Sequence, residues 1–176
     1  TTLFRSVGYR GSSAGGVSAD DNFRTNLEGA QAAGLDVGIY FYSQAISEDE
    51  AREEADFAIS QLAGTKLQLP VVFDLERQGG NGRPDSLSDE EVTAIANAFC
   101  TRVESAGYTA MIYGSTSDIE RYDLTSISAN LWVAQYGTLT PTSDFRYVMW
   151  QYSTDGSVAG IDGTVDMDLD LSGALS

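Results

Sequence analysis

The sequence predicts an α/β fold, an irregular, helix-poor barrel of the TIM-like (β/α) type. Segments with helical periodicity alternate with short runs of β-branched and aromatic residues, as in sheets whose strands are joined by helices. The strand segments are apolar almost throughout, which is typical of parallel strands buried on both faces. At least seven segments have strand character but only three or four have a clear helical pattern, so a barrel fits better than a doubly wound sheet. Because the chain has 176 residues, we expect one domain over residues 1–176.

One pattern occurs three times in the first two thirds of the chain: a polar start, a helical stretch, an Ala-Gly stop and an apolar strand. Ser47 and Glu50 have capping-box spacing at the start of the second helix, and Ser88 and Glu91 repeat it in the third. Cys100 lies on the apolar face of that third helix, which indicates a buried structural thiol. In chain order, the predicted elements are a strand over 3–9, helices that end at 33–34, 63–64 and 106–107, and strands over 37–42, 69–76, 108–113, 131–136, 147–152 and 165–171.

The composition excludes several kinds of chemistry. The net charge is −16, there is no histidine, and Cys100 is the single cysteine. The chain therefore cannot form a Ser-His-Asp triad, a His-ligated zinc site, an internal disulfide or a multi-cysteine metal site. Its ten basic residues are scattered singly, so we expect no nucleic-acid binding. Proton transfer would have to come from carboxylates, tyrosines or the single lysine, Lys66.

The sequence contains neither a membrane-crossing segment nor a recognisable signal peptide. No apolar run approaches the ~20 residues that a membrane-crossing helix needs, so we expect no membrane insertion. No basic-then-apolar signal peptide opens the sequence, which neither shows nor excludes secretion because a mature form would look the same.

Two acidic residues end an otherwise apolar predicted strand. Asp74 and Glu76 stand two positions apart, so the pleat directs both side chains to one face, with their Cα atoms about 7 Å apart. In a parallel barrel, this carboxyl end of the strands is the rim that carries active sites. The alternative is that both acids form ion pairs with arginines such as Arg5, Arg10 or Arg77. A catalytic carboxyl pair is the functional hypothesis.

Aromatic and amide residues gather at the ends of other predicted strands. Tyr40 and Tyr42 end one strand, and aromatic-plus-amide clusters lie at residues 132–136 and 150–152. Aromatic faces together with amide and carboxylate groups suit a sugar ring, which has apolar C–H faces and hydroxyl groups. For each tryptophan taken singly, packing in the core is the alternative.

Three aspartates alternate near the carboxyl terminus. Asp166, Asp168 and Asp170 could share one face of a strand, either as an exposed acidic face or as part of a site. An EF-hand calcium loop does not fit, because Leu171 stands where that loop requires glycine. An acidic calcium-binding protein built on residues 162–170 is a third functional class, and it predicts a calcium-dependent melting temperature.

Taken in this order, the segments resemble the glycoside hydrolase family 25 lysozymes, which are N-acetylmuramidases that cleave peptidoglycan. The resemblance covers nearly the whole chain, and the ordered set is more specific than any one motif. The segments that carry it are residues 4–11, 21–26, 32–40, 70–76, 99–100, 111–113, 132–136, 150–153 and 160–166.

The resemblance implies a glycoside hydrolase that cleaves the β-1,4 bond between N-acetylmuramic acid and N-acetylglucosamine in peptidoglycan glycan strands. It implies that Glu76 is the catalytic acid, Asp74 its partner and Asp166 a further active-site carboxylate. By the same resemblance, no metal and no organic cofactor are needed, and the protein acts outside the cell, at the cell wall. The residues that would line the cleft are Tyr40, Tyr42, Tyr113, Gln135 and Trp150.

Two mechanisms are open for this pair. In one, a carboxylate activates water or attacks the sugar carbon, and the separation of the carboxyls decides between inversion and retention. In the other, the 2-acetamido oxygen of the substrate attacks while Asp74 orients the amide. The short D-x-E spacing and the resemblance favour the second mechanism. In both, the charge of Asp74 and partial burial would keep Glu76 protonated.

The sequence departs from the family pattern at its start. Family members begin with a strand that carries an Asp-x-Ser motif, and this strand is absent before Phe4. Either the sequence is trimmed, or we expect a natural barrel without its first strand, whose open edge is covered by self-association or by an extra segment. The competing hypothesis is a catalytically impaired relative that binds carbohydrate in the cell wall.

Overall fold

A computed structural model of the chain describes residues 2–171 and has a mixed α/β fold. The 3₁₀ helix η1 spans Arg83–Ser86. The helices are α1 (Phe23–Ala32), α2 (Glu48–Leu62), α3 (Asp89–Ser105) and α4 (Thr116–Ile119). The strands are β1 (Thr2–Arg10), β2 (Val17–Ala19), β3 (Asp36–Tyr42), β4 (Val71–Asp74), β5 (Ala110–Ser115), β6 (Asn130–Ala134), β7 (Met149–Gly156) and β8 (Val165–Asp170).

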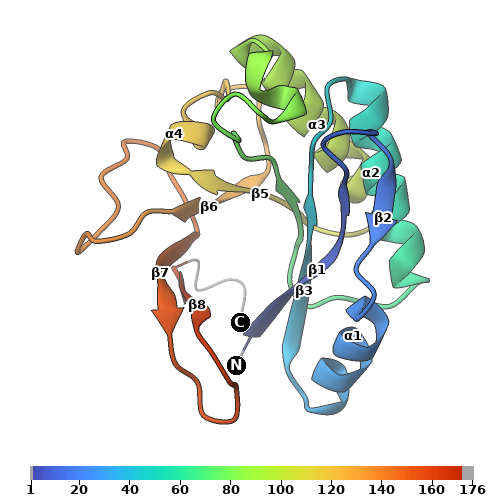
Figure 1. Cartoon of the computed structure of the whole chain (residues 1–176), viewed down its shortest axis with the longest axis vertical. Coiled ribbons are helices and arrows are strands. Elements are labelled where there is room, and N and C mark those ends of the chain that lie inside the picture. Colours follow the sequence, from blue (N-terminus) through green and yellow to red (C-terminus); the bar gives the residue numbers. More distant parts are fainter. Residues whose placement is uncertain (1, 172–176) are drawn as a thin grey trace.

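All eight strands form one strongly curled sheet (Figure 1), in the order β2-β1-β3-β4-β5-β6-β7-β8. The six central strands, β1, β3, β4, β5, β6 and β7, run parallel to one another. Strands β2 and β8 form the two edges, and each pairs antiparallel with its neighbour. The predicted helix-poor α/β fold is confirmed, in the form of a half-barrel. Strand β2 was not expected, because three residues are too few to show a period.

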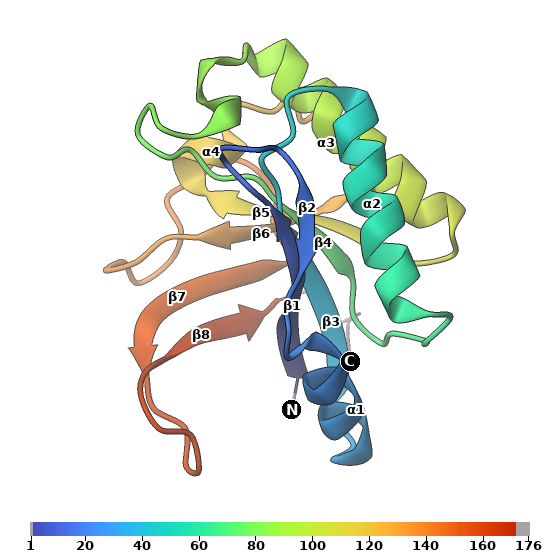
Figure 2. The same ribbon diagram turned by 45° about the vertical axis from the view of Figure 1, so that its right-hand side comes forward.

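Helices α1, α2 and α3 lie on one face of the sheet. The β7–β8 hairpin, at the end of the strand order opposite β2 and β1, projects away from these helices (Figure 2). The core between helices and sheet contains Phe41, Phe73 and Phe99, all without solvent exposure. Cys100 is buried in this core, as predicted, and burial raises the pKa of its thiol to about 12. Within residues 2–171, no helix is long and apolar enough to cross a membrane.

Both predicted helix starts are present, but only one capping box is complete. Ser88 Oγ accepts a hydrogen bond from the Glu91 amide, and the Glu91 carboxylate accepts one from the Ser88 amide at 2.8 Å. Ser47 likewise caps α2. The Glu50 carboxylate does not return to the Ser47 amide, because it forms a two-point ion pair with Arg83 at 2.8 and 2.9 Å.

A buried ion network fastens α2 to the ends of β1 and β3. The Arg10 Nε donates to Glu54 at 2.6 Å, and the Ser43 hydroxyl donates to the other Glu54 oxygen at 2.6 Å. Arg10 is 2% exposed and Glu54 is not exposed at all. Desolvation outweighs these two partners and raises the pKa of Glu54 to about 7. The network lies beside the carboxyl ends of the strands, where the candidate site is formed.

A second, smaller core lines the concave side of the sheet. Phe4 and Trp132 meet there with ring centroids 4.7 Å apart. Gly38 makes room for Phe4, since a Cβ at position 38 would lie 2.3 Å from its ring. The buried members of this core are Val72, Met111, Trp132, Val148 and Met149.

Candidate active site

A row of aromatic side chains with one carboxyl crosses the concave face at the carboxyl ends of the strands. The sheet register pairs Tyr42 with Asp74, Asp74 with Tyr113, and Tyr113 with Trp132. Tyr9 pairs with Tyr42 and extends the row to β1. Because residues of one register row on parallel strands point to the same face, Asp74 lies between two tyrosines.

Asp74 is the most enclosed acid of the cleft. It is the last residue of β4, it is 6% exposed, and its Oδ1 is buried without a hydrogen-bond partner. Burial, the charge of Glu76 and a hydrogen bond with Glu76 hold the pKa of Asp74 well above its ordinary value. Two carboxyls that share a hydrogen bond must share a proton, so the pair keeps one proton to a higher pH than separate acids would.

Glu76 is the more accessible member of the pair. Its partial burial and the charge of Asp118 raise the pKa of Glu76, while the hydrogen bond with Asp74 acts in the opposite direction. In the free protein, the two acids therefore hold one proton between them, and both raised pKa values belong to the pair. The structure thus brings together the two acids that the sequence singled out.

One wall of the site continues towards β1 and β2. Tyr42 accepts a hydrogen bond from the Gln78 side-chain amide, and burial together with the two acids raises the pKa of Tyr42 to about 12. Beyond them lies a cavity of about 530 Å³, bounded by Tyr9, Tyr42, Gln78 and the 11–18 hairpin. Tyr42 therefore remains a neutral hydrogen-bonding group at physiological pH.

Gln151 joins the opposite wall. Its Oε1 accepts hydrogen bonds from Tyr113, at 2.8 Å, and from Tyr136. Its neighbour in the β7–β8 ladder is Asp168, which accepts a hydrogen bond from Trp132 Nε1 at 2.9 Å. Desolvation, strengthened by the charge of Asp166, raises the pKa of Asp168 to about 6.

Two other predicted residues lie on the concave side. Asp166 is exposed, and its charge raises the pKa of both Tyr136 and Asp168, so it lies on the same face of β8 as Asp168. Tyr40 is half-buried against the concave core, and burial followed by the charge of Asp74 raises its pKa. Asp166 therefore borders the cleft from the hairpin, while Tyr40 lies beneath the acid pair.

The structure does not place Gln135 and Trp150 in the cleft. Gln135 clamps the loop after β6 by donating to Thr142 Oγ1 and accepting from the Thr142 amide, each at 2.8 Å. Trp150 is 6% exposed, packs in the helix-side core and donates to the Gln135 carbonyl at 2.8 Å. Side chains alternate along a strand, so Trp150 and Gln151 face opposite sides of β7.

That alternation is the signal that the sequence analysis missed. Once Trp132 faces the cleft, Tyr136 shares its parity and Gln135 does not. Within each predicted cluster, the structure turns Tyr136 and Gln151 towards Tyr113, whereas Gln135 and Trp150 make their hydrogen bonds elsewhere. Both tryptophans are core residues, with 5% and 6% exposure for Trp132 and Trp150.

The shifted acids predict a stability maximum on the acidic side of neutrality. The pKa values of Glu54 and Asp168 are raised to about 7 and about 6, and those of Asp74 and Glu76 are also raised. Since the unfolded chain releases these protons at a lower pH than the folded chain, the free energy of unfolding falls as pH rises from about 4.5 to about 7. Urea unfolding at pH 5 and pH 7.5, at constant ionic strength, should give the higher midpoint at pH 5. An equal or higher midpoint at pH 7.5 would contradict this.

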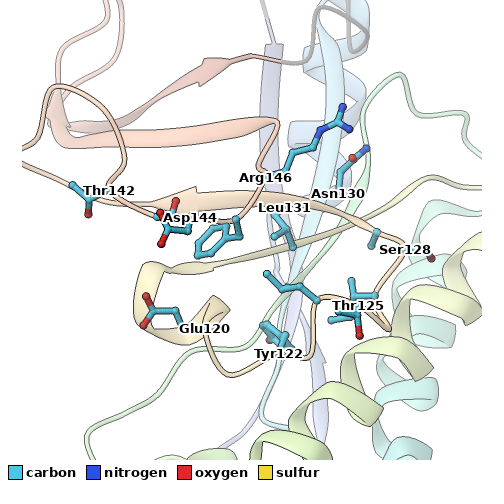
Figure 3. A pocket seen from close by; sticks show the side chains of 14 residues that line it. Glu120, Tyr122, Thr125, Ser128, Asn130, Leu131, Thr142, Asp144 and Arg146 are labelled. Carbon is cyan, nitrogen blue, oxygen red and sulfur yellow. The ribbon is translucent and has the colours of Figure 1, made fainter.

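A larger cavity, of about 800 Å³, lies away from these acids (Figure 3). It opens between the α4–β6 connection and the β6–β7 connection, and Tyr122, Leu131 and Phe145 belong to its walls. Its acidic residues, Glu120 and Asp144, show none of the pairing that links Asp74 and Glu76. We therefore locate the chemistry at the carboxyl pair rather than in the larger cavity.

A linked pair of carboxyl groups is the catalytic device of most glycosidases. A carboxyl pair at the carboxyl ends of a curled parallel sheet, where barrel enzymes carry their active sites, is the arrangement expected of a glycosidase of the barrel class. The sequence profile of glycosyl hydrolases family 25 matches residues 8–161, and the chain belongs to this family.

Individual relatives agree with this assignment. The autolytic lysozyme of Clostridium acetobutylicum is 28% identical over 96% of this chain and 50% of its own length. Lysozyme M1 of Streptomyces globisporus is 27% identical over 84% of this chain and 53% of its own length. The chain thus spans about half the length of these curated relatives. In fold, it superposes on the spore cortex lytic enzyme SleM of Clostridium perfringens with a TM-score of 0.82, at 22% identity over 96% of this chain and 59% of that one.

Proposed function

We propose that residues 1–176 form the catalytic domain of a peptidoglycan hydrolase, an N-acetylmuramidase. The bond cleaved would be the β-1,4 linkage between N-acetylmuramic acid and N-acetylglucosamine. The observation that carries this proposal is the proton-sharing pair of Asp74 and Glu76 in a family 25 chain whose sequence relatives are lysozymes. Action at the cell wall, outside the cell, follows from the same function.

Glu76 is the general acid in this proposal. It is the accessible member of the pair, so it can reach the glycosidic oxygen, and Asp74 supplies its proton through their hydrogen bond. When the proton moves to Glu76, Asp74 becomes a carboxylate. Glu76 then donates the proton to the leaving oxygen as the bond to the sugar carbon breaks.

Asp74 acts on the substrate's amide. Its buried Oδ1 has no hydrogen-bond partner among residues 2–171, so an N–H group of a bound 2-acetamido sugar can supply the missing hydrogen bond. Such a bond holds the acetamido oxygen against the sugar carbon and favours the substrate-assisted mechanism, which retains the anomeric configuration. The enclosure of Asp74 also disfavours its direct attack on the sugar.

The glycan strand would lie along the aromatic row. Tyr42 and Tyr113 flank the acids, and the cavity beside Tyr9 and Gln78 gives the strand room beyond them. Asp166 would contact the strand from the β8 side. An amide-bearing sugar polymer suits these neutral phenol and amide groups, which offer hydrogen bonds and ring faces without a charge.

Product analysis tests the proposed activity. Purified peptidoglycan is treated with the protein, and the released reducing ends are identified by mass spectrometry. N-acetylmuramic acid at the new reducing ends supports the proposal, whereas N-acetylglucosamine there shows a different bond specificity. Binding to glycan without any release would instead support the carbohydrate-binding alternative.

The net charge of −16 predicts an unusual salt response. Peptidoglycan and its attached polymers are often anionic, so the protein and its substrate repel each other at low ionic strength. In 0.1 M salt, exposed charges more than about 10 Å apart are largely screened from each other. We therefore expect the initial rate of cell-wall cleavage to rise from 10 mM to 150 mM NaCl. Turbidity loss of a cell-wall suspension measures it. A rate that falls over this range would contradict the electrostatic argument.

Coverage of the open sheet edge stays a prediction. The outer edges of β2 and β8 are the ends of the strand order, and a second copy of the chain or an additional segment could pair there. Light scattering of the purified protein would distinguish these two partners.

A further inference from the structure

The arginine beside the catalytic acid points away from the acid pair. Arg77 directly follows Glu76, but its Nε donates to Asp118 Oδ1 at 3.0 Å and its Nη2 donates to the Ser117 carbonyl at 2.9 Å. One guanidinium thus makes two bonds to the short helix α4, which directly follows β5. The main chain next to Glu76 is thereby tied to a neighbouring element of the sheet.

Hydrogen bonds at the start of α4 fix the Asp118 carboxylate in the position where it accepts from Arg77. The Asp118 side chain is 12% exposed, its Oδ2 accepts from Ser115 Oγ at 2.5 Å, and its amide donates to the same hydroxyl. Gly114 allows the close approach, because a Cβ there would lie 3.2 Å from the Asp118 Cβ. Exposed ion pairs seldom have such a preformed acceptor.

The charges around the acid pair explain why the direction of Arg77 matters. Asp118 raises the pKa of both Asp74 and Glu76. A guanidinium that turned onto Glu76 would have the opposite effect and would favour its ionised form. The titratable and charged groups that face the pair or Asp118 are Tyr40 and Tyr42 from β3, Tyr113 from β5, Tyr136 after β6, Tyr122 from the α4–β6 connection, and Arg77 itself.

The five tyrosines do not compete in this balance. Burial raises the pKa of each above its ordinary value, so all five stay neutral while the carboxyls titrate. The charge on Glu76 is then governed by Asp74, by Asp118 and by the position of one arginine.

We propose that Asp118 is a positioning residue for the acid pair, which holds Arg77 away from Glu76 and anchors the main chain that carries Glu76. The role rests on the proposed function, in which Glu76 must enter the reaction protonated. Asp118 touches neither substrate nor the reacting atoms, and it acts through Arg77 and through its own charge.

Three variants test this role. Asp118→Asn removes the charge and frees Arg77, so the basic limb of the kcat/KM profile should move down by roughly one pH unit. Arg77→Gln leaves Asp118 charged but unpaired, so the limb should not move down. The double variant lacks the arginine that could turn towards Glu76. Its basic limb should therefore be shifted less from the wild-type position than the basic limb of Asp118→Asn. Glu120→Gln, an exposed neutralisation two positions further along, is the matched control and should not move the limb.

Carboxyl titration by ¹³C NMR gives the same comparison without activity. The apparent pKa values of the Asp74 and Glu76 pair should fall in Asp118→Asn and recover in part in the double variant. Unchanged titrations in Asp118→Asn, or a double variant further from the wild type than Asp118→Asn, would overturn the proposal. If the titrations behave as expected but the wild type cleaves no peptidoglycan, the proposed function fails while the positioning role stands.

Discussion

Glu76→Gln is expected to lower kcat for peptidoglycan cleavage by about 10²–10⁴-fold, the usual contribution of a positioned general acid. Glutamine has nearly the same shape as the acid but cannot transfer a proton to the leaving oxygen. Because Glu76 is only partly buried, the variant should fold normally and bind glycan fragments with an affinity close to that of the wild type. Reducing-end release under saturating substrate measures kcat, and calorimetry with a glycan fragment measures binding.

Comparison with Asp74→Asn separates the two acids. The asparagine removes both the shared proton and the carboxylate that orients the amide, so we expect a loss of similar size. Its pH profile should differ, since Glu76 then titrates alone rather than as one member of a pair that shares a proton. Glu104→Gln, an exposed change on α3, is the matched control and should keep full activity. A Glu76→Gln protein that keeps more than a tenth of the wild-type kcat would exclude Glu76 as the acid.

The sequence predicted the fold well where a period extends over several residues. The three helix starts and the apolar strands rest on local patterns, and seven of the eight strands were expected close to their observed positions. Strand β2 was not predicted, because it is held by its pairing with β1 rather than by a pattern of its own. The two strands approach so closely that a Cβ on Gly8 would lie 2.3 Å from the Ser18 carbonyl oxygen. Close approach of this kind depends on tertiary structure.

The candidate site was predictable in part for a similar reason. The D-x-E pair is a local pattern at a strand end, and the structure brings Asp74 and Glu76 together as that pattern indicates. The choice between Gln135 and Gln151 needed the parity of each strand relative to the sheet. Asp118 could not be identified from the sequence, because it acts on Glu76 through Arg77. Only the folded chain brings Arg77, after β4, next to Asp118 in α4.

The second large effect is expected in stability. Arg10→Met should lower the free energy of unfolding by about 3–5 kcal/mol near pH 9, where Glu54 is ionised in the intact network; this is the range for leaving one partner of a buried ion pair behind. Methionine fills similar space, but Glu54 would keep its complete burial without the cation 2.6 Å away. Arg10 also donates to the Glu50 and Gly15 carbonyls, so the 11–16 hairpin should loosen as well. Urea unfolding followed by circular dichroism measures the change.

The pH dependence of that loss identifies its cause. Once Glu54 is protonated it no longer needs a cation, so the difference between the wild type and Arg10→Met should shrink as pH falls below the pKa of Glu54, about 7 in the intact network. Arg52→Met is the control, since the ion pairs of Arg52 with Glu48 and Asp49 are exposed and should contribute about 1 kcal/mol or less. The double variant Arg10→Met, Glu54→Met should recover stability relative to Arg10→Met, because it removes the uncompensated acid. A loss that is independent of pH and unrelieved in the double variant would show that Arg10 acts by packing and by its carbonyl bonds rather than as the counter-ion of Glu54.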